Sequence, residues 1–409
     1  MQKSAGAGRR ILRLRHVRRA NRAVVLQMLR HSEHMSRADI ARHSGLSEGA
    51  VSRITAGLIK DQLVREDGEE NSTGGRPGRR LRLEPKRVAF GAEIENWETR
   101  FAVTNMRGRI VESWRVRTPS AATDAVEQIA TEFERTRKRL GTARIPGIGI
   151  CMRGVVDSRT GTLIQGNRRE WANVPARTIL ESLVSEPVFV ENNVRAAAFA
   201  EYTYGGAEVY SAHCFVLVMV SDGVGMGILF DGKPYHGPRM AAGELGQIVI
   251  AFSGGEQRHD RPGCLEGLVS NAATCQRYCA LGGEHRFPSA GDTSARVQRL
   301  VQWAGNGDAA AKQALEETAL YLGAGISNVV WELDADVVVV DGAITGAWPL
   351  VAPLLRQQLP DLHERAGVPM VLRSSALAGD AALIGAASLP FASVFATGDS
   401  LPYVTAAGV

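Results

Sequence analysis

Residues 36–58 read SRADIARHSGLSEGAVSRITAGL, a stretch that predicts two short helices joined by a tight turn. Ser36 and Asp39 have the spacing of a capping box, in which each side chain accepts a hydrogen bond from a backbone N–H group at the start of a helix. Gly45 can adopt the left-handed conformation that a tight turn needs, so the first helix ends there. Ser47 caps a second helix, and the stretch as a whole predicts a helix-turn-helix.

The second helix combines an apolar face with a face that is small, polar and basic. Val51, Ile54 and Leu58 recur at helical spacing and form the apolar face. The opposite face suits the major groove of double-stranded DNA, because short residues allow a close approach while serine and arginine contact base edges and phosphates. A plain three-helix bundle is the alternative. The expected DNA contacts of this region are Ser36, Arg37, Ser47, Glu48, Gly49, Ser52 and Arg53.

The flanking segments complete a winged reader domain. Upstream, apolar residues recur at helical spacing between Val24 and Leu29, and Asn21 can cap this helix through its side-chain oxygen. Downstream, residues 63–65 and 81–83 are typical of two short strands around a Gly-rich connection, which is the pattern of a wing. An arginine on an extended arm can enter a narrow minor groove, whereas a disordered linker is the alternative. The expected wing contacts are Arg76, Pro77 and Arg79, and Pro85 marks the end of the domain.

The charge distribution favours a polyanionic partner. The chain has 409 residues and a net charge of +5, and arginines crowd the segment before Glu33, its first acidic residue. An organellar transit peptide is the alternative for such an acid-free start. Hydrophobic residues at 44% and charged residues at 22% exclude a fibrous or disordered chain. The length predicts more than one domain.

Apolar runs and cysteines indicate a cytoplasmic protein without a membrane partner. The longest apolar runs, Cys214–Val220 and Val337–Val340, are too short to cross a bilayer and are typical of buried strands. The five cysteines are an odd number scattered through apolar sequence, which predicts reduced thiols in the cytosol.

Beyond residue 86 the chain alternates strand-like and helix-like segments, which predicts an α/β fold. The segments expected to form strands are Val88–Ile94, Arg100–Asn105, Ile145–Cys151, Val188–Val190, Phe215–Val220 and Val337–Val340.

A series of glycine-rich and polar motifs follows in one order along this part of the chain. They are GIGI at 147–150, GVVD at 154–157, Asn167 with Trp171, PVFVENN at 187–193, DGVGMG at 222–227, GELGQ at 243–247, GCLE at 263–266, Gly342 and LAGDAALIG at 377–385. Each motif is weak by itself, but the ordered set resembles the ROK family (repressors, open reading frames and sugar kinases), as do the helix-turn-helix, wing and Gly-Arg-Pro tip.

The resemblance implies a winged helix-turn-helix followed by a two-lobed, actin-like (ribonuclease H-like) sugar-kinase fold. We expect the DNA-binding domain at residues 1–85, the first lobe at 86–200 completed by 380–409, and the second lobe at 201–379.

Departures from the family pattern indicate that the kinase chemistry is lost. A kinase of this family needs a carboxylate as general base, and the matching position holds Asn193. The family's first phosphate loop, Asp-x-Gly-Gly-Thr, is replaced by EIENWET at 93–99, in which charge and bulk oppose ATP. Of the family's zinc ligands only Cys264 is kept, and the other ligand positions hold Gln247, Gln257 and His259. We therefore expect no catalytic residue, no cofactor and no metal.

The resemblance implies a sugar or sugar-derivative effector, because polar groups able to grip hydroxyls remain at the family's sugar-binding positions. These candidate ligand residues are Asn167, Asn192, Asn193, Glu244, Gln247 and Glu266. The sequence thus predicts a DNA-binding transcription regulator, expected to be a repressor and to form a homodimer or a higher homo-oligomer. The alternatives are an active sugar kinase with an accessory reader and a DNA-binding protein that needs no ligand.

Overall fold

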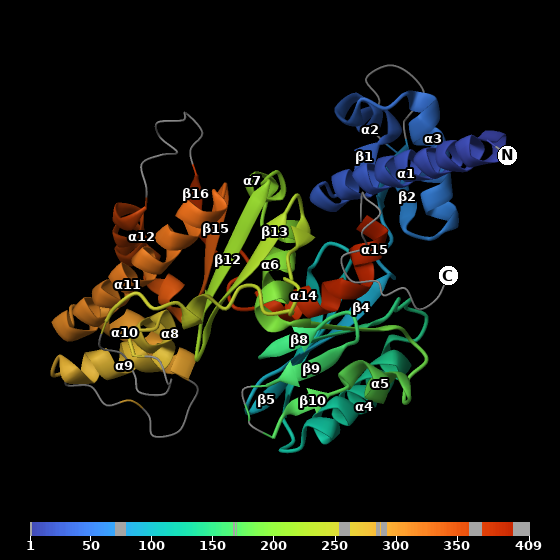
Figure 1. The fold of residues 1–409 in the computed structure, drawn as a ribbon. Coiled ribbons are helices and arrows are strands. Elements are labelled where there is room, and N and C mark those ends of the chain that lie inside the picture. Colours follow the sequence, from blue (N-terminus) through green and yellow to red (C-terminus); the bar gives the residue numbers. More distant parts are fainter. Residues whose placement is uncertain are drawn as a thin grey trace. The chain divides into compact units, whose positions relative to one another are not determined.

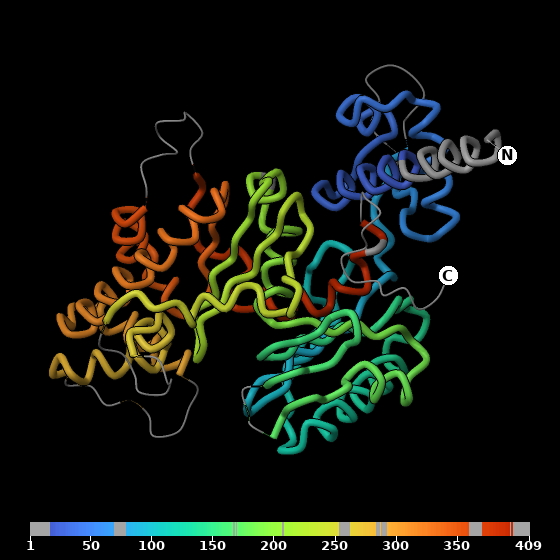
Figure 2. Tube along the Cα trace, viewed as in Figure 1, coloured from blue at the N-terminus to red at the C-terminus, as the bar shows by residue number. Residues whose placement is uncertain are grey.

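The computed structural model describes residues 2–69, 79–166, 168, 170–252, 262–283, 287, 293–359 and 370–395 (Figure 1, Figure 2). The chain divides into two compact units. The first comprises Met1–Glu191 with Ala386–Val409, and the second comprises Asn192–Gly385. The chain therefore passes between the units before Asn192 and after Gly385.

The reader domain contains the predicted helix-turn-helix and wing strands. Its elements are α1 (Gln2–His31), β1 (Met35–Ser36), α2 (Arg37–Ser44), α3 (Glu48–Lys60), β2 (Val64–Glu69) and β3 (Arg79–Leu83). The strands form an antiparallel sheet in the order β1-β3-β2. Ser36 and Asp39 form the predicted capping box, and Gly45 ends α2 with a φ of 69°.

The predicted start of the first helix at Asn21 is wrong, because α1 begins at Gln2. Residues 2–20 contain no proline and are rich in alanine, leucine and arginine, which favour a helix. The helix continues through Gly6 and Gly8, so Asn21 lies inside it rather than at its cap.

The core of the reader domain includes residues from the far end of the chain. Leu26 and Leu29 of α1 pack in one cluster with Leu58 of α3 and with Phe391 and Phe395. These phenylalanines belong to η3 (Leu389–Phe391) and α15 (Ala392–Phe395). Figure 2 follows this red C-terminal segment to the blue helix α1 of the same unit. The predicted boundary at Pro85 lies inside this unit, in the connection between β3 and the next strand, β4 (Val88–Ile94).

The rest of the first unit is built on a five-stranded sheet in the order β11-β7-β4-β5-β6. Its strands are β4 (Val88–Ile94), β5 (Glu98–Asn105), β6 (Ile110–Arg117), β7 (Ile148–Met152) and β11 (Val188–Asn192). A smaller sheet contains β8 (Val155–Asp157), β9 (Thr162–Gln165) and β10 (Ala172–Val174), and two helices are α4 (Ala122–Leu140) and α5 (Ala176–Glu181). Phe90 and Phe101 of the large sheet pack with Phe133 of α4, because α4 turns its apolar face to the sheet.

The second unit is built on a sheet in the order β14-β13-β12-β15-β16. Its strands are β12 (Cys214–Val220), β13 (Val224–Phe230), β14 (Lys233–Pro234), β15 (Val337–Gly342) and β16 (Val371–Ser374). The helical elements are α6 (Asn193–Tyr204), α7 (Ala207–Tyr210), η1 (Leu245–Gln247), α8 (Leu265–Val269), α9 (Asn271–Ala280), α10 (Thr293–Gly305), α11 (Ala309–Leu333), η2 (Ala343–Ala347) and α12 (Trp348–Gln358). A further helix, α14 (Ala381–Ser388), begins in this unit and continues past Gly385 into the first. The predicted strands beyond residue 86 are all present, with ends that differ by a few residues.

Glycines let α6 lie close to β13 and α14. A Cβ atom at Gly227 would collide with Ala198, and one at Gly385 would collide with the carbonyl oxygen of Ala196. Because the side chain of any other residue would push these elements apart, glycine fixes the distance at which α6 sits on its neighbours.

Two predictions on composition can also be assessed. All five cysteines are free thiols, as expected for a reduced protein. Among the described helices, none is both long and apolar enough to span a membrane.

Candidate functional site

The outer face of α3 is the candidate DNA-reading surface. Val51 and Leu58 are fully buried beneath it, so the predicted apolar stripe is confirmed. Apart from its chain neighbours and the backbone of its own helix, no atom lies within 4 Å of the position that a Cβ atom would take at Gly49, and Arg53 donates from Nε to the Gly49 carbonyl oxygen at 3.2 Å. A flat, open surface of this kind permits close approach of a groove. The exposed residues of this face are Ser47, Glu48, Gly49, Ser52 and Arg53.

Two other predicted DNA contacts have partners inside the reader domain. Ser36 is buried and exchanges hydrogen bonds with Asp39. Arg37 donates to Thr55 Oγ1 at 3.2 Å and to Glu66 at 2.8 Å. The contacts of Arg37 connect α2 to α3 and to the wing. Contacts of Ser36 and Arg37 with DNA remain predictions.

Glu66 is the anchor of the described part of the wing. Arg79 forms an ion pair with it beside Arg37. Hydrogen bonds from Arg37 and then from Arg79 lower the pKa of Glu66 below its ordinary value. The predicted contacts Arg76 and Pro77 lie outside the described residues.

The candidate ligand residues of the second unit gather around the first half of β13. Asn192 caps α6, because its Oδ1 accepts from the backbone N–H groups of Val194 at 2.9 Å and Arg195 at 3.1 Å. Asn193 is buried, and its Nδ2 lies 3.8 Å from Met219 Sδ on β12. The first turn of α6 is therefore fixed beside the sheet.

Glu266 and Glu244 approach β13 from two further elements. Glu266 Oε2 accepts from the backbone N–H group of Val224 at 2.9 Å. The loop that precedes Glu244 is fixed by Gly243, whose carbonyl oxygen accepts from the Met226 N–H group at 2.8 Å. Gly243 has a φ of 98°, and a Cβ atom there would collide with Met226, so only glycine suits this position.

The two carboxylates share one electrostatic environment. Glu244 keeps access to solvent, yet partial burial of its carboxyl, followed by the like charge of Glu266, raises its pKa. The positive charge of Arg195 opposes this shift. Gln247 is half-buried at the end of η1, and the sixth candidate, Asn167, lies outside the described residues.

Arg195 is a candidate site residue that sequence reasoning missed. It is 4% exposed on a helix whose next residues are Ala196, Ala197 and Ala198. A buried arginine in such an apolar run needs a specific partner, and this was the signal available in the sequence.

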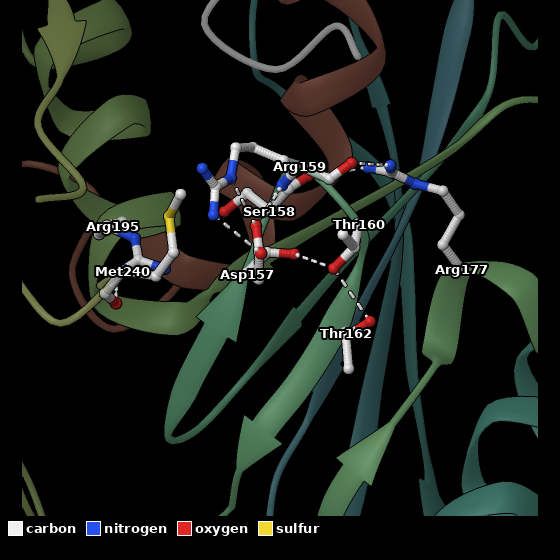
Figure 3. A network of polar contacts seen from close by, with 8 residues as sticks. All are labelled: Asp157, Ser158, Arg159, Thr160, Thr162, Arg177, Arg195 and Met240. Carbon is white, nitrogen blue, oxygen red and sulfur yellow. Dashed lines mark hydrogen bonds and ion pairs between the residues drawn. The ribbon is translucent and has the colours of Figure 1, made fainter. Parts of the chain in front are cut away.

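A polar network in the first unit orders the loop after the GVVD motif (Figure 3). Asp157 forms a two-pronged ion pair with Arg159, with both N–O distances at 3.1 Å. Arg159 lowers the pKa of Asp157 below its usual range. Arg177 donates to the carbonyl oxygens of Ser158 at 2.9 Å and Val188 at 3.0 Å. Asp157 and Arg177 therefore stabilise the backbone of this loop.

Comparison with known proteins decides the family. The model of the ROK family matches residues 90–392. The chain belongs to the ROK family. The IclR helix-turn-helix domain matches residues 22–68, which contain α2 and α3.

Relatives of this ROK protein include both regulators and kinases. The xylose repressor of Bacillus spizizenii is 23% identical over 91% of this chain and 95% of its own length. A crystal structure of a ROK family transcriptional regulator, a homologue of the Escherichia coli MLC protein, has a TM-score of 0.74, 22% identity, and covers 93% of this chain and 97% of its own. A ROK glucokinase from Streptomyces griseus, solved with glucose and AMPPNP, has a TM-score of 0.63, 23% identity, and covers 74% and 98%. The predicted fold class is confirmed.

The hairpin that replaces the ROK phosphate loop is compact. Glu95 and Glu98 pair through a backbone hydrogen bond of 3.2 Å, and Trp97 at the tip is 78% exposed. Glu93 is buried and forms an ion pair of 3.0 Å with Arg100, while Arg115 pairs with Glu98 at 2.7 Å. Arginine thus offsets the charge repulsion predicted from the sequence, and the exclusion of a phosphate by the bulk of the hairpin stays a prediction.

Two of the four positions of the family's zinc motif, Gln247 and Cys264, lie among the described residues. Cys264 is buried as the N-cap of α8, and the half-buried Gln247 stands where the family has a ligand. Within the described ranges, no group of three or more His, Cys, Asp or Glu side chains could hold a metal. Gln257 and His259 lie outside them.

Proposed function

We propose that this ROK protein is a DNA-binding transcriptional repressor that responds to a sugar or sugar derivative and transfers no phosphoryl group. The observation that carries the proposal is the pairing of an exposed reading face on α3 with Asn193 at the position of the catalytic base. An amide can hydrogen-bond a hydroxyl, but it cannot remove its proton. The sensor therefore keeps groups for binding while the base for chemistry is absent.

The ligand is gripped by the candidate residues around β13. Glu244 and Glu266 accept hydrogen bonds from sugar hydroxyls, and the Asn193 amide supplies a donor and an acceptor. A sugar that binds one state of the sensor more tightly shifts the reader by no more than that difference in affinity. The regulator works in the cytoplasm as a homodimer or a higher homo-oligomer, which places two reading faces on one operator.

The proposal is tested in two steps with the full-length protein. Selection from a random duplex library should enrich a two-fold symmetric sequence, and fluorescence anisotropy should give its affinity. Titration with D-xylose, D-glucose, N-acetyl-D-glucosamine and their 6-phosphates should then weaken binding for at least one compound. A coupled assay with the same sugars and ATP should give no sugar phosphate.

Each alternative has its own result in this design. Turnover of ATP with a sugar would favour a kinase with an accessory reader. Sequence-specific DNA binding that no sugar alters, together with no thermal shift by any of them, would favour a regulator without a ligand. Absence of any enriched duplex would remove the DNA-binding half of the proposal.

A further inference from the structure

Arg195 occupies a costly position for a charge. It is the third residue of α6 and is 4% exposed, directly after Asn193 and Val194. Removing a guanidinium from water without compensation costs several kcal/mol, so buried arginines are kept by specific partners. The backbone N–H group of Arg195 donates to Asn192 Oδ1 in the helix cap. This bond does not involve the guanidinium, so the burial of the guanidinium depends on the contacts of the side chain.

The side chain reaches the loop that leads to Glu244. Its Nη1 donates to the carbonyl oxygen of Met240 at 3.0 Å, and both residues are labelled in Figure 3. Met240 is 7% exposed and has a φ of 59°, a left-handed conformation that is unfavourable for methionine. Such a conformation persists when surrounding contacts hold it. Arg195 is one of those contacts.

Two backbone hydrogen bonds also fix this loop, which comprises residues 236–243. The Ala242 N–H group donates to the His236 carbonyl oxygen at 3.1 Å, and Gly243 is bound to β13 through Met226. Arg195 therefore binds the middle of this loop, and Glu244 directly follows its last residue, Gly243. Loss of the hydrogen bond between Arg195 and Met240 should therefore loosen the backbone next to Glu244, a candidate ligand residue.

Charge gives Arg195 a second effect on Glu244. Partial burial and the negative charge of Glu266 both favour the protonated form of the Glu244 carboxyl, and Arg195 favours the ionised form. An ionised carboxylate only accepts hydrogen bonds and binds hydroxyl donors more strongly than a neutral acid. The guanidinium thus supports the form of Glu244 that suits a sugar.

We propose that Arg195 is a positioning residue of the candidate ligand site, which holds the loop of residues 236–243 in place before Glu244 and places a positive charge near that carboxyl group. The proposal rests on the proposed function for its ligand, but the contacts that carry it lie within the second unit and need no ligand to be tested.

The first test separates the charge of Arg195 from its bulk in the ligand-free protein. Carboxyl carbon-13 NMR should show Glu244 titrating at a higher pH in Arg195→Gln than in the native chain, because burial and Glu266 then act unopposed. Arg195→Lys keeps a positive charge and should restore the native titration. Identical Glu244 titrations in the native chain and Arg195→Gln would overturn the proposal.

The second test concerns the loop. Hydrogen exchange of residues 236–244 should accelerate by roughly tenfold or more in Arg195→Met, which removes the hydrogen bond to Met240. Arg277→Gln is the matched control, since Arg277 is also largely buried in the second unit and donates to the Leu268 carbonyl oxygen at 2.7 Å. It should leave exchange of the 236–244 loop unchanged. Native exchange in Arg195→Met, or equal acceleration in both variants, would overturn the positioning role.

The third test uses whichever of D-xylose, D-glucose or N-acetyl-D-glucosamine binds the native protein. Affinity should fall about 10- to 100-fold in Arg195→Gln, because the loop before Glu244 loses its hydrogen bond and Glu244 loses a nearby positive charge, and Arg195→Lys should recover most of the affinity. Equal losses in the two variants would overturn the proposal. If the native chain binds none of these sugars, the sugar-sensing part of the proposed function fails instead, while the NMR and exchange results still decide the role of Arg195.

Discussion

The candidate reading face of α3 and the candidate ligand site of the second unit are built in opposite ways. Ser52 and Arg53 lie exposed on one helix, and each can meet DNA without moving a neighbour. Asn193, Glu244 and Glu266 come from three elements, the charges of Glu266 and Arg195 both act on Glu244, and Glu266 is bonded to the backbone of β13. Substitution on the face should remove one contact, whereas substitution in the site should change several interactions together.

The reader domain nevertheless depends on a distant part of the chain. Gln27 Nε2 donates to the Phe395 carbonyl oxygen at 3.3 Å, and the Arg30 guanidinium lies 4.7 Å from the Phe395 ring centroid. Phe395 itself is 9% exposed in the reader core. The face of α3 is therefore supported by a core that the C-terminal segment completes.

The largest expected effect tests this support. Phe395→Ala should lower the free energy of unfolding of the first unit by about 3 to 4 kcal/mol, because it leaves a cavity beside α1. DNA affinity should fall with it, although no residue of the reading face has changed. Chemical denaturation monitored in the reader domain, together with fluorescence anisotropy on the selected duplex, measures both.

Phe252→Ala is the matched control for this substitution. Phe252 is fully exposed, so the same change in composition removes no packing and should alter stability by less than about 0.5 kcal/mol. If the two variants unfold alike, the C-terminal segment does not complete the reader core.

The second prediction concerns a buried carboxyl group of the second unit, whereas Ser52 and Arg53 on α3 are exposed. Asp341 is 4% exposed, and burial raises its pKa to about 6. Between about pH 4 and about pH 6, Asp341 therefore binds more protons in the folded than in the unfolded state, so its contribution to stability falls as pH rises through this window. The shift corresponds to a loss of up to about 3 kcal/mol.

Asp341→Asn should remove this loss, because an amide oxygen still accepts from the N–H groups of Gly342 and Gly379 without carrying charge. Thermal unfolding from pH 4 to pH 7 should show a flatter stability profile and a more stable variant at pH 7. Asp157→Asn is the control, since the lowered pKa of Asp157 puts its titration below the window. If the stability of Asp341→Asn changed with pH as steeply as that of the native protein, the prediction would be contradicted.

A smaller effect is expected on the reading face. Arg53→Ala should weaken binding to the selected duplex by about 1 to 3 kcal/mol and relax the sequence preference, if Arg53 reads a base edge. Stability should hardly change, because the side chain is exposed. Competition binding against single-base variants of the duplex measures the preference, and Arg135→Ala on α4 is an exposed control. An equal loss on all duplexes would assign Arg53 to phosphate.

The sequence was most informative where a single element defines the feature. Helical spacing placed Val51 and Leu58 in the core and the polar face of α3 outside, and runs of β-branched residues located the sheet strands. Hydrophobic periodicity could not predict that Phe395 enters the reader core or that Arg195 meets Met240, because these contacts join distant segments. The start of α1 was missed for a local reason, since a possible cap at Asn21 says nothing about helix continuing before it.

For the ligand site, the family motifs indicated residues but not their interactions. Glu244 and Glu266 are 22 positions apart in the chain, and only folding places them in one electrostatic environment. The role of Gly243 followed from its positive φ and its approach to Met226. These facts explain why substitutions in the sensor are expected to be less independent than those on α3.

The smallest expected effect is on phosphoryl transfer. Asn193→Asp should create no measurable ATP-dependent sugar phosphorylation, since it restores only a general base, which contributes roughly 10² to 10⁴-fold. Transfer also needs a nucleotide and its metal held in line with the acceptor. In this chain, Trp97 and the ion-paired Glu93 occupy the hairpin in which the family has glycines that expose backbone N–H groups to a phosphate.

A coupled assay with D-xylose, D-glucose and N-acetyl-D-glucosamine measures this prediction, with an active ROK glucokinase as the positive control. Sugar affinity should be followed in parallel, because a carboxylate at position 193 accepts hydrogen bonds from hydroxyls more strongly than the native amide does. Tighter sugar binding without turnover would show that the variant is folded and that the site is intact, so the missing step lies at the nucleotide. Sugar phosphate above background would instead show that the hairpin admits ATP and that one residue separates this regulator from a kinase.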